Sequence, residues 1–354
     1  MSRRREFLKT ASALGAAGLI AGCTGGDGDG GGGENASGDG GNAGENETTE
    51  AGNESGGDEE SSQLTFGGDG EINMGVSPSV PQDNLIQQYG PVRDHLQSYV
   101  TENYDVPDGL EASMFVGNNY SAIIQALGQG TADLAETGPF AAALGVKSDN
   151  ADIVLQRKGY GSWTYVSQMA TSPDSDIESL SDLEGKRVAF SDQLSTSGCL
   201  YPLYDMKTEG GLDVGDLPEG SGTNADFEAT FAGGHPASYE LLANGRVDAA
   251  AMGGFVPGII GEDEFESNAR VFHRHEGLPR APIVVSADLG DDEQSALQQA
   301  FLEAPQSIYH GQDGEEGTDD DLWFSDVREA DVETYQGVID VANELDVSQD
   351  IFQG

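Results

Sequence analysis

The sequence predicts an α/β protein of two lobes. Short apolar runs that read as strands alternate with helical patterns from residue 71 onward. Such alternation is typical of mainly parallel sheets covered by helices. Roughly 280 residues carry the pattern, which is enough for two lobes. In sheets of this kind ligands bind beyond the carboxyl ends of the strands.

The charge of the chain is strongly negative. It has 63 Asp and Glu against 16 Lys and Arg, a net charge of -47. No basic patch can form, so nucleic acid is excluded as a partner. Acidic residues are spread along the whole chain, which suits a protein in molar salt, where the Debye length is about 3 Å and self-repulsion is screened. We therefore expect a halophilic source.

The N-terminus reads as an export signal. Residues 4–9 match the twin-arginine pattern, an apolar run follows at 11–21, and residues 20–23 resemble a lipobox ending in Cys23. We expect a twin-arginine lipoprotein signal peptide at 1–22, a lipid on Cys23 and a position on the outer face of the cell membrane. The alternative is a signal anchor with an incidental cysteine.

Residues 23–70 are Gly-rich and acidic with hardly any apolar side chain, so we expect a disordered tether. N-glycosylation sequons occur at Asn35, Asn46, Asn53 and, further on, Asn119. With Cys23 carrying a lipid, Cys199 is left alone, which gives no disulfide and no cysteine-based metal site.

The folded part divides into a first lobe at 71–164, a second lobe at 165–272 and a return to the first lobe at 273–354. We expect strands at residues 72–76, 111–116, 132–135, 153–156, 165–170, 187–190, 227–231, 247–252, 271–272 and 283–286. Helices are expected at 82–104, 120–128, 140–146, 180–183, 199–207, 236–244, 294–304 and 332–345.

Three hydroxyl residues lie between the predicted strand at 187–190 and the start of the next predicted helix: Ser195, Thr196 and Ser197. A helix N-terminus has unpaired N–H groups and a partial positive charge. With three hydroxyls it forms a neutral cradle for a tetrahedral oxyanion. The alternative is an ordinary helix cap, since Ser and Thr are favoured there.

Polar residues also follow other strands. They are Ser77, Tyr120, Thr137 and His235. Each has a simpler interpretation as a surface, turn or cap residue. Their common position at strand ends in both lobes favours one shared binding site.

Several short motifs occur in a fixed order. They are N-Y-S-A-I-I-Q-A-L at 119–127, A-D-L-A at 132–135 with Gly138-Pro139, Y-V-S at 165–167, L-S-D-L-E-G-K-R-V-A-F at 180–190, S-T-S-G at 195–198 with Pro202, G-H-P-A-S at 234–238 and G-R-V-D-A-A-A at 245–251. From about residue 72 to 305 the chain resembles the phosphate, phosphite and phosphonate substrate-binding proteins of ABC importers.

The resemblance implies a two-lobed type II periplasmic-binding fold, with a cleft between the lobes and a hinge near Tyr165 and residues 271–283. It also implies that Tyr120, the Ser195–Ser197 cradle and His235 bind the oxyanion. Thr137 falls where aminoalkylphosphonate binders carry Tyr. Where those binders hold the ligand's ammonium with acids, this chain has Phe255 and Ala281, and Arg280 adds positive charge.

We therefore expect a monomeric, lipid-anchored receptor that passes phosphite, phosphate or a simple phosphonate to an ABC permease and ATPase. Other anions, of the sulfonate or nitrate type, and a surface sensor or adhesion protein remain alternatives. An enzyme with Ser197 or Cys199 as nucleophile and His235 as base is disfavoured, because no G-x-S-x-G motif is present. His273 and His275 give only a weak metal signal. We expect no cofactor and no metal.

Overall fold

The computed structural model describes residues 63–68, 70–78, 82–348 and 351. The expected signal peptide, Cys23 and the sequons at Asn35, Asn46 and Asn53 lie outside the described residues. Asn119 lies inside them and caps a helix by accepting the Ala122 N–H at 2.8 Å. Within the described part of the chain, no helix combines the length and the apolar character needed to cross a bilayer.

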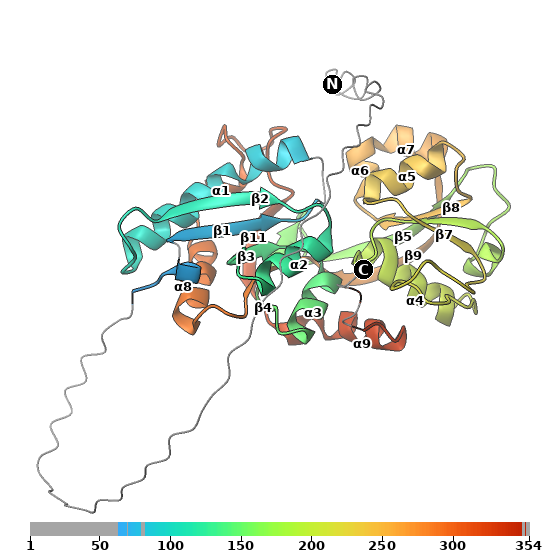
Figure 1. The fold of residues 1–354 in the computed structure, drawn as a ribbon. Coiled ribbons are helices and arrows are strands. Elements are labelled where there is room, and N and C mark those ends of the chain that lie inside the picture. Colours follow the sequence, from blue (N-terminus) through green and yellow to red (C-terminus); the bar gives the residue numbers. More distant parts are fainter. Residues whose placement is uncertain (1–62, 69, 79–81, 349–350, 352–354) are drawn as a thin grey trace, which may run out of the picture. The chain divides into compact units, whose positions relative to one another are not determined.

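A six-stranded sheet forms the first lobe, with strand order β11-β4-β10-β3-β1-β2 (Figure 1). Its strands are β1 (Glu71–Val76), β2 (Glu111–Val116), β3 (Leu134–Glu136), β4 (Ala151–Gly159), β10 (Pro282–Ser286) and β11 (Phe324–Glu329). β1 is parallel to both β2 and β3, whereas β10 runs antiparallel to β3 and β4. The carboxyl ends of β1, β2 and β3 therefore lie at one edge.

Helices cover both faces of this sheet with their apolar sides. Helices α1 (Gln82–Asn103) and α8 (Asp291–Leu302) pack on one face, in a core that includes Tyr89 and Phe301. Helices α2 (Tyr120–Gly128) and α3 (Pro139–Lys147) pack on the other face with Ile123 and Phe140. Burial of these apolar stripes on a sheet is the main stabilising term of such a layered lobe.

A five-stranded sheet forms the second lobe, with strand order β7-β6-β8-β5-β9. Its strands are β5 (Thr164–Thr171), β6 (Arg187–Phe190), β7 (Glu228–Phe231), β8 (Ala249–Gly253) and β9 (Arg270–Pro279). Helices α5 (His235–Ala243), α6 (Val256–Ile260) and α7 (Glu262–Asn268) share one core, and α4 (Tyr201–Thr208) contributes to another. The expected two-lobed α/β fold is thus confirmed.

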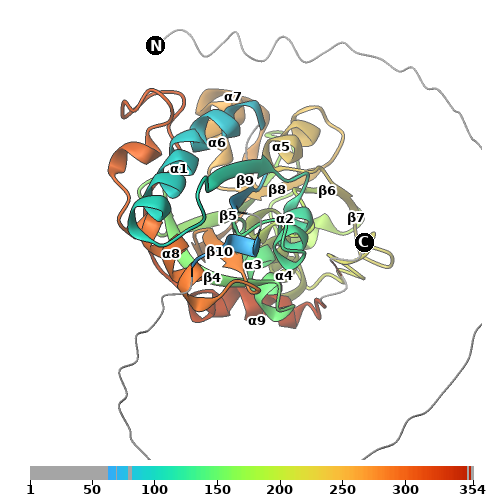
Figure 2. The same cartoon turned by 60° about the vertical axis from the view of Figure 1, so that its left-hand side comes forward.

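The chain passes between the sheets twice, from β4 to β5 and from β9 to β10. β9 stays paired with β5 as far as Pro279, opposite Thr164. The second sheet therefore extends beyond the boundary at residue 272 that the sequence predicts. The C-terminal helix α9 (Gln336–Glu344) lies beside α3 of the first lobe and α4 of the second (Figures 1 and 2).

Two α-helices and one strand of the described chain were not expected from the sequence. α6 spans five residues and includes Pro257 and Gly258, so it is too short and irregular to show helical periodicity. α7 consists largely of acidic residues. β11 is an edge strand of sequence F-S-D-V-R-E. Its side chains are mostly polar, so the sequence lacks the apolar alternation that predicts a strand.

The folded chain begins earlier than the predicted end of the tether at residue 70. Phe66 is fully buried and Leu64 is 6% exposed, both in the core under α1 and α8. The N–H groups of Thr65 and Phe66 donate to Glu293 Oε1 at 2.9 and 2.8 Å. The prediction was wrong here because two apolar residues inside a polar segment carry little compositional signal.

Replacing Phe66 by Ala should lower the free energy of unfolding by about 3–5 kcal/mol, the usual cost of emptying a buried aromatic site. Chemical denaturation in molar KCl measures this. The exposed Gln63 supplies the control, because Gln63→Ala removes a side chain that is not buried. Equal stability of the two variants would show that the domain starts after residue 70.

A buried carboxylate joins α4 to the hinge strand β9. Asp205 is 1% exposed, and its Oδ2 lies 2.8 Å from His273 Nε2 while Oδ1 lies 2.9 Å from His275 Nδ1. Burial raises the pKa of Asp205, but the hydrogen bonds from the two histidines outweigh it and hold the pKa below its ordinary value. The hydrogen bond to Asp205 raises the pKa of His275 despite desolvation.

The raised pKa of His275 makes stability depend on pH. Its contribution is fully present below the unfolded histidine pKa, about 6.5, and is lost as the pH rises through the higher folded pKa. The free energy of unfolding should therefore fall above about pH 6.5, and His275→Gln should flatten this dependence. His310→Gln, outside the cluster, serves as control. Asp205→Asn should cost about 1.5–3 kcal/mol at pH 6. A wild-type stability that stays flat between pH 6 and 9 would contradict this assignment.

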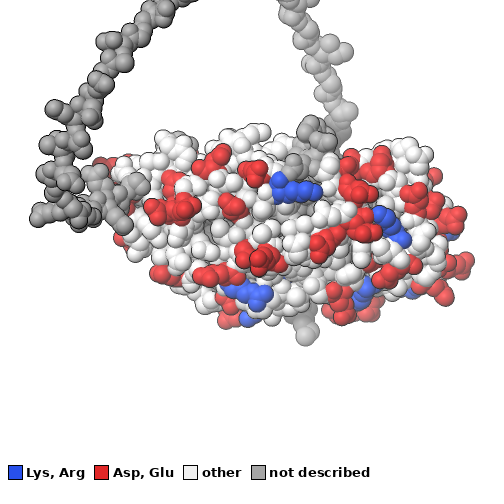
Figure 3. All heavy atoms as spheres, turned by 90° about the horizontal axis from the view of Figure 1, so that it is seen from below, with Lys and Arg blue, Asp and Glu red and all other residues white. Residues whose placement is uncertain are grey.

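Acidic side chains far outnumber basic ones on the surface visible in Figure 3. Figure 3 shows Asp and Glu spread over the whole of the face in view, with few Lys and Arg between them. Such a surface repels itself in dilute buffer and is screened in concentrated salt. Adaptation to high salt stays a prediction.

Candidate functional site

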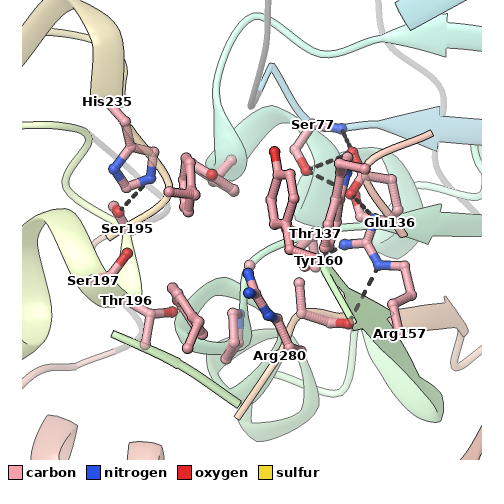
Figure 4. Close-up of a pocket in the computed structure, with 17 residues that line it drawn as sticks. Ser77, Glu136, Thr137, Arg157, Tyr160, Ser195, Thr196, Ser197, His235 and Arg280 are labelled. Carbon is pink, nitrogen blue, oxygen red and sulfur yellow. Dashed lines mark hydrogen bonds and ion pairs between the residues drawn. The ribbon is translucent and has the colours of Figure 1, made fainter. Parts of the chain in front are cut away.

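A cavity of about 70 Å³ lies between the two lobes. One water molecule needs only about 10–15 Å³ of such space, so the cavity admits a small polyatomic ligand. Figure 4 shows Ser195–Ser197 and His235 on one side, Glu136 and Thr137 on the other, and Arg280 and Tyr160 between them. The wall consists of Ser77, Tyr120, Glu136, Thr137, Gly138, Pro139, Arg157, Tyr160, Tyr165, Ser195, Thr196, Ser197, His235, Phe255, Arg280, Ala281 and Trp323.

The structure thus brings together every residue predicted to bind the ligand. Among the described residues, four helical segments begin in this wall. α2 begins at Tyr120, α3 at Pro139, a π-helical turn at Thr196 and α5 at His235. Each segment brings the positive end of its dipole to the cavity, although some first-turn N–H groups already have acceptors, such as Phe140 N–H on Thr196 Oγ1 and Gly198 N–H on Ser195 Oγ. These dipoles favour an anion in the cavity.

Internal hydrogen bonds hold the cradle in place. Ser195 Oγ accepts the Gly198 N–H at 3.0 Å, and Leu200 N–H reaches back five residues to Ser195 O. Ser167 Oγ donates to Ser197 O at 2.7 Å. Thr196 Oγ1 accepts the Phe140 N–H at 2.9 Å, which links the cradle to α3 of the first lobe. The Thr196 hydroxyl keeps its proton as a donor, and the Tyr165 hydroxyl in the same wall lies within hydrogen-bonding reach of it.

His235 is poised as a neutral donor. Its Nδ1 accepts the Gly253 N–H at 3.0 Å, and Ser191 Oγ lies 3.1 Å from the same nitrogen. A neutral ring whose Nδ1 accepts carries its proton on Nε2. Nε2 lies 3.4 Å from Ser195 Oγ at the cavity wall. Burial lowers the pKa of His235 to about 4, so the ring donates this N–H without being charged.

Two hydroxyls from the first lobe complete the donor set. Thr137 Oγ1 is buried and has no hydrogen-bond partner among the described residues. An orphaned buried hydroxyl costs about 1–3 kcal/mol, so its position in a cavity wall points to a ligand. Tyr120 is 9% exposed, and burial raises its pKa, so its hydroxyl stays protonated and able to donate.

Ser77 lines the cavity, but its polar groups are already engaged. Its hydroxyl lies 3.0 Å from both Glu136 O and Glu136 Oε1, and its N–H donates to Oε1 at 2.8 Å. The Ser77 hydroxyl has one proton, and Glu136 accepts it, so none remains to donate to a ligand. Its role as a ligand-binding residue stays a prediction, and the structure favours a supporting one.

Sequence reasoning missed a buried ion pair beside the cavity. Glu136 Oε2 lies 2.5 Å from Arg157 Nη1, and the two side chains are 2% and 1% exposed. Arg157 also donates to Thr137 O at 3.3 Å and lies over the Trp323 ring. The available signal was a charged residue directly after each of two predicted strands, 132–135 and 153–156, where a buried charge usually requires a partner.

Arg280 and aromatic rings form the remaining wall. Arg280 is 8% exposed, with its guanidinium 5.1 Å from the Tyr165 ring and 5.4 Å from the Tyr160 ring. The Tyr160 and Phe255 rings stack with centroids 6.4 Å apart. Phe255 and Ala281 stand in the wall, as the sequence predicts, and neither accepts a hydrogen bond from an ammonium group through its side chain.

Two α/β lobes joined by a double crossover, with a donor-lined cavity between them, define a periplasmic binding protein of the type II fold. The chain belongs to the family described as the periplasmic substrate-binding protein of the phosphonate ABC transporter, whose profile matches residues 74–335.

Individual relatives agree with this family. The chain is 30% identical over 204 residues to the phosphate-import protein PhnD of Mycolicibacterium smegmatis, a match that spans 55% of this chain and 59% of that relative. A binding protein of an ABC phosphonate transporter from Pseudomonas aeruginosa superposes with a TM-score of 0.61 at 21% identity, covering 78% of this chain and 86% of its own. PhnD1 of Prochlorococcus marinus, solved with methylphosphonate, gives 0.60 at 20% identity, covering 78% and 98%.

The neutral state of His235 can be measured by NMR. Its imidazole should titrate with a midpoint near 4 and keep the Nε2–H tautomer above it, because burial disfavours the charged ring. Between about pH 4 and 6.5 the unfolded chain then binds more protons, so His235 makes stability rise with pH in that window. His310 supplies a reference signal. A midpoint of 6.5 or higher for His235 in the free protein would contradict the neutral assignment.

Proposed function

We propose that this protein is the extracellular, lipid-anchored receptor of an ABC importer and captures a phosphorus oxyanion: phosphite, phosphate or a simple phosphonate. The observation that carries the proposal is the convergence of neutral donors on one small cavity. They are the Ser195–Ser197 hydroxyls, His235 Nε2–H, Tyr120 and the unpartnered Thr137 Oγ1. Donors from both lobes would then close on the same tetrahedral anion.

This donor arrangement does not favour catalysis. A histidine that acts as a general base must present an unprotonated nitrogen to the nucleophile. Here Nδ1 is occupied by the Gly253 N–H, and the nitrogen facing Ser195 carries the proton. Cys199 is fully buried, and burial raises the pKa of its thiol. We infer that the site binds its ligand without converting it.

Export and anchoring belong to the same proposal. The twin-arginine pattern and Cys23 would place the folded domain outside the cell on a tether, where a permease and its ATPase could receive the ligand. Binding as a monomer suffices for this task, because all donors of the cavity come from one chain.

Isothermal titration in molar KCl with phosphite, phosphate, methylphosphonate and sulfate tests the ligand class. At least one phosphorus oxyanion should bind more tightly than sulfate. Ser197→Ala should weaken that binding by about ten- to a hundredfold, the loss of one hydrogen bond to a charged group, whereas the exposed Ser181→Ala should not.

The two ring nitrogens of His235 can be separated by substitution. The amide of Gln reaches the position of Nε2 and keeps a donor, whereas the shorter Asn replaces Nδ1 only. His235→Gln should therefore retain more affinity than His235→Asn, and His235→Ala should lose about ten- to a hundredfold. Equal affinity in the wild type and the three variants would remove His235 from the site.

In the ligand panel, tighter binding of sulfate than of every phosphorus oxyanion would overturn the assignment of the ligand as a phosphorus oxyanion.

A further inference from the structure

We infer that the Arg280 guanidinium pairs directly with the bound anion and thereby selects dianionic phosphorus oxyanions over zwitterionic aminoalkylphosphonates. This inference rests on the proposed function and narrows its ligand class.

The first observation is that Arg280 is a buried cation without a protein counter-charge. It is 8% exposed, and within the described part of the chain it takes part in no ion pair, while its Nε is buried with no hydrogen-bond partner. The titratable groups near it are Arg157, which carries a like charge, and the hydroxyls of Tyr160 and Tyr165, which burial keeps neutral by raising their pKa values. A buried charge is strongly disfavoured unless it is paired.

The second observation is that the only carboxylate in the described cavity wall is already paired. Glu136 Oε2 binds Arg157, and Oε1 accepts both the N–H and the hydroxyl of Ser77. Glu136 and Arg157 cancel in charge, so neither neutralises Arg280. An ammonium group entering the cavity would meet no free carboxylate and would face Arg280 at close range.

The third observation is the backbone of Arg280, which is held rigidly at the crossover. Its N–H donates to Trp163 O at 3.0 Å, and its carbonyl accepts from Tyr335 Oη at 2.8 Å. Tyr160 and Tyr165 then flank the guanidinium. Figure 4 shows the side chain directed into the space between the cradle and Glu136. Such a preorganised cation loses little freedom on binding.

With His235 neutral, Arg280 leaves the described wall with one uncompensated positive charge. A ligand that carries two negative charges and no cation satisfies both the donor cradle and Arg280. An aminoalkylphosphonate would also bring its ammonium group close to the Arg280 guanidinium, which is a buried contact between two positive charges. Discrimination then comes from repulsion as well as attraction.

The test compares methylphosphonate with 2-aminoethylphosphonate by calorimetry in molar KCl. Wild type should bind methylphosphonate at least tenfold more tightly. Arg280→Met should weaken methylphosphonate binding by about ten- to a hundredfold and bring the two affinities within a few-fold of each other. Arg280→Lys keeps the charge and should keep the preference.

Arg274→Met is the matched control, because it removes one arginine of β9 that is exposed. It should change neither affinity nor preference. Melting curves check that each variant is folded, and Arg280→Gln replaces Arg280→Met should the latter fail to fold.

A second readout is the pH profile. The wild-type affinity for methylphosphonate should rise through the second ionisation of the ligand, and this slope should flatten in Arg280→Met. A purely structural role for Arg280 would leave the slope unchanged.

The outcomes distinguish failure of the role inferred for Arg280 from failure of the proposed function. If wild type binds both ligands equally, or if Arg280→Met keeps the wild-type preference and slope, the role of Arg280 is overturned while the phosphorus receptor stands. If wild type binds no phosphorus oxyanion in the panel, the proposed function itself fails, and this inference with it.

Discussion

The buried ion pair between Glu136 and Arg157 is the interaction on which the site depends. It ties together the end of β1 through Ser77, the end of β3 and the strand β4. Arg157 also donates to Ala281 O in the crossover and lies against Trp323 before β11. Removing such an ion pair from water costs free energy, which offsets much of its attraction. Its main effect is therefore to fix the relative positions of the strands that it joins, rather than to add net stability. Its hydrogen bonds hold three strand ends of the first lobe in register around the cavity.

Anion capture by so acidic a chain depends on the difference between electrostatic forces at long range and at short range. A net charge of -47 repels any anion at a distance, but molar salt confines that repulsion to about 3 Å. The helix N-termini, the hydroxyls and Arg280 line the cavity itself, so under the proposed function they would meet the anion at contact distance, where salt cannot intervene. Neutral donors also suit a chain with few Lys and Arg, because they need no positive surface. The surface and the site therefore obey separate electrostatic constraints.

Sequence patterns predicted the positions of the site more fully than its contacts. β6 and the turn at Ser195 follow from an apolar run that ends in hydroxyls, and His235 from a glycine turn before a helix. The pairing of Glu136 with Arg157 joins residues from two strands, and no local pattern carries such a contact. The same limit explains Ser77, whose place at a strand end was predictable but whose hydroxyl is directed to Glu136. α6 and β11 were missed because tertiary packing, and not periodicity, defines them.

The place where the N-terminal segment enters the folded domain has a mechanical consequence. Leu64 and Phe66 precede the amino end of β1, whereas Ser77, just after its carboxyl end, lines the cavity. A force applied through the N-terminus is therefore received by the Phe66 side chain and by the two N–H groups bound to Glu293. It enters the first sheet at the end of β1 remote from the cavity. Under the proposed anchoring, tension on the tether is therefore applied away from the cavity wall.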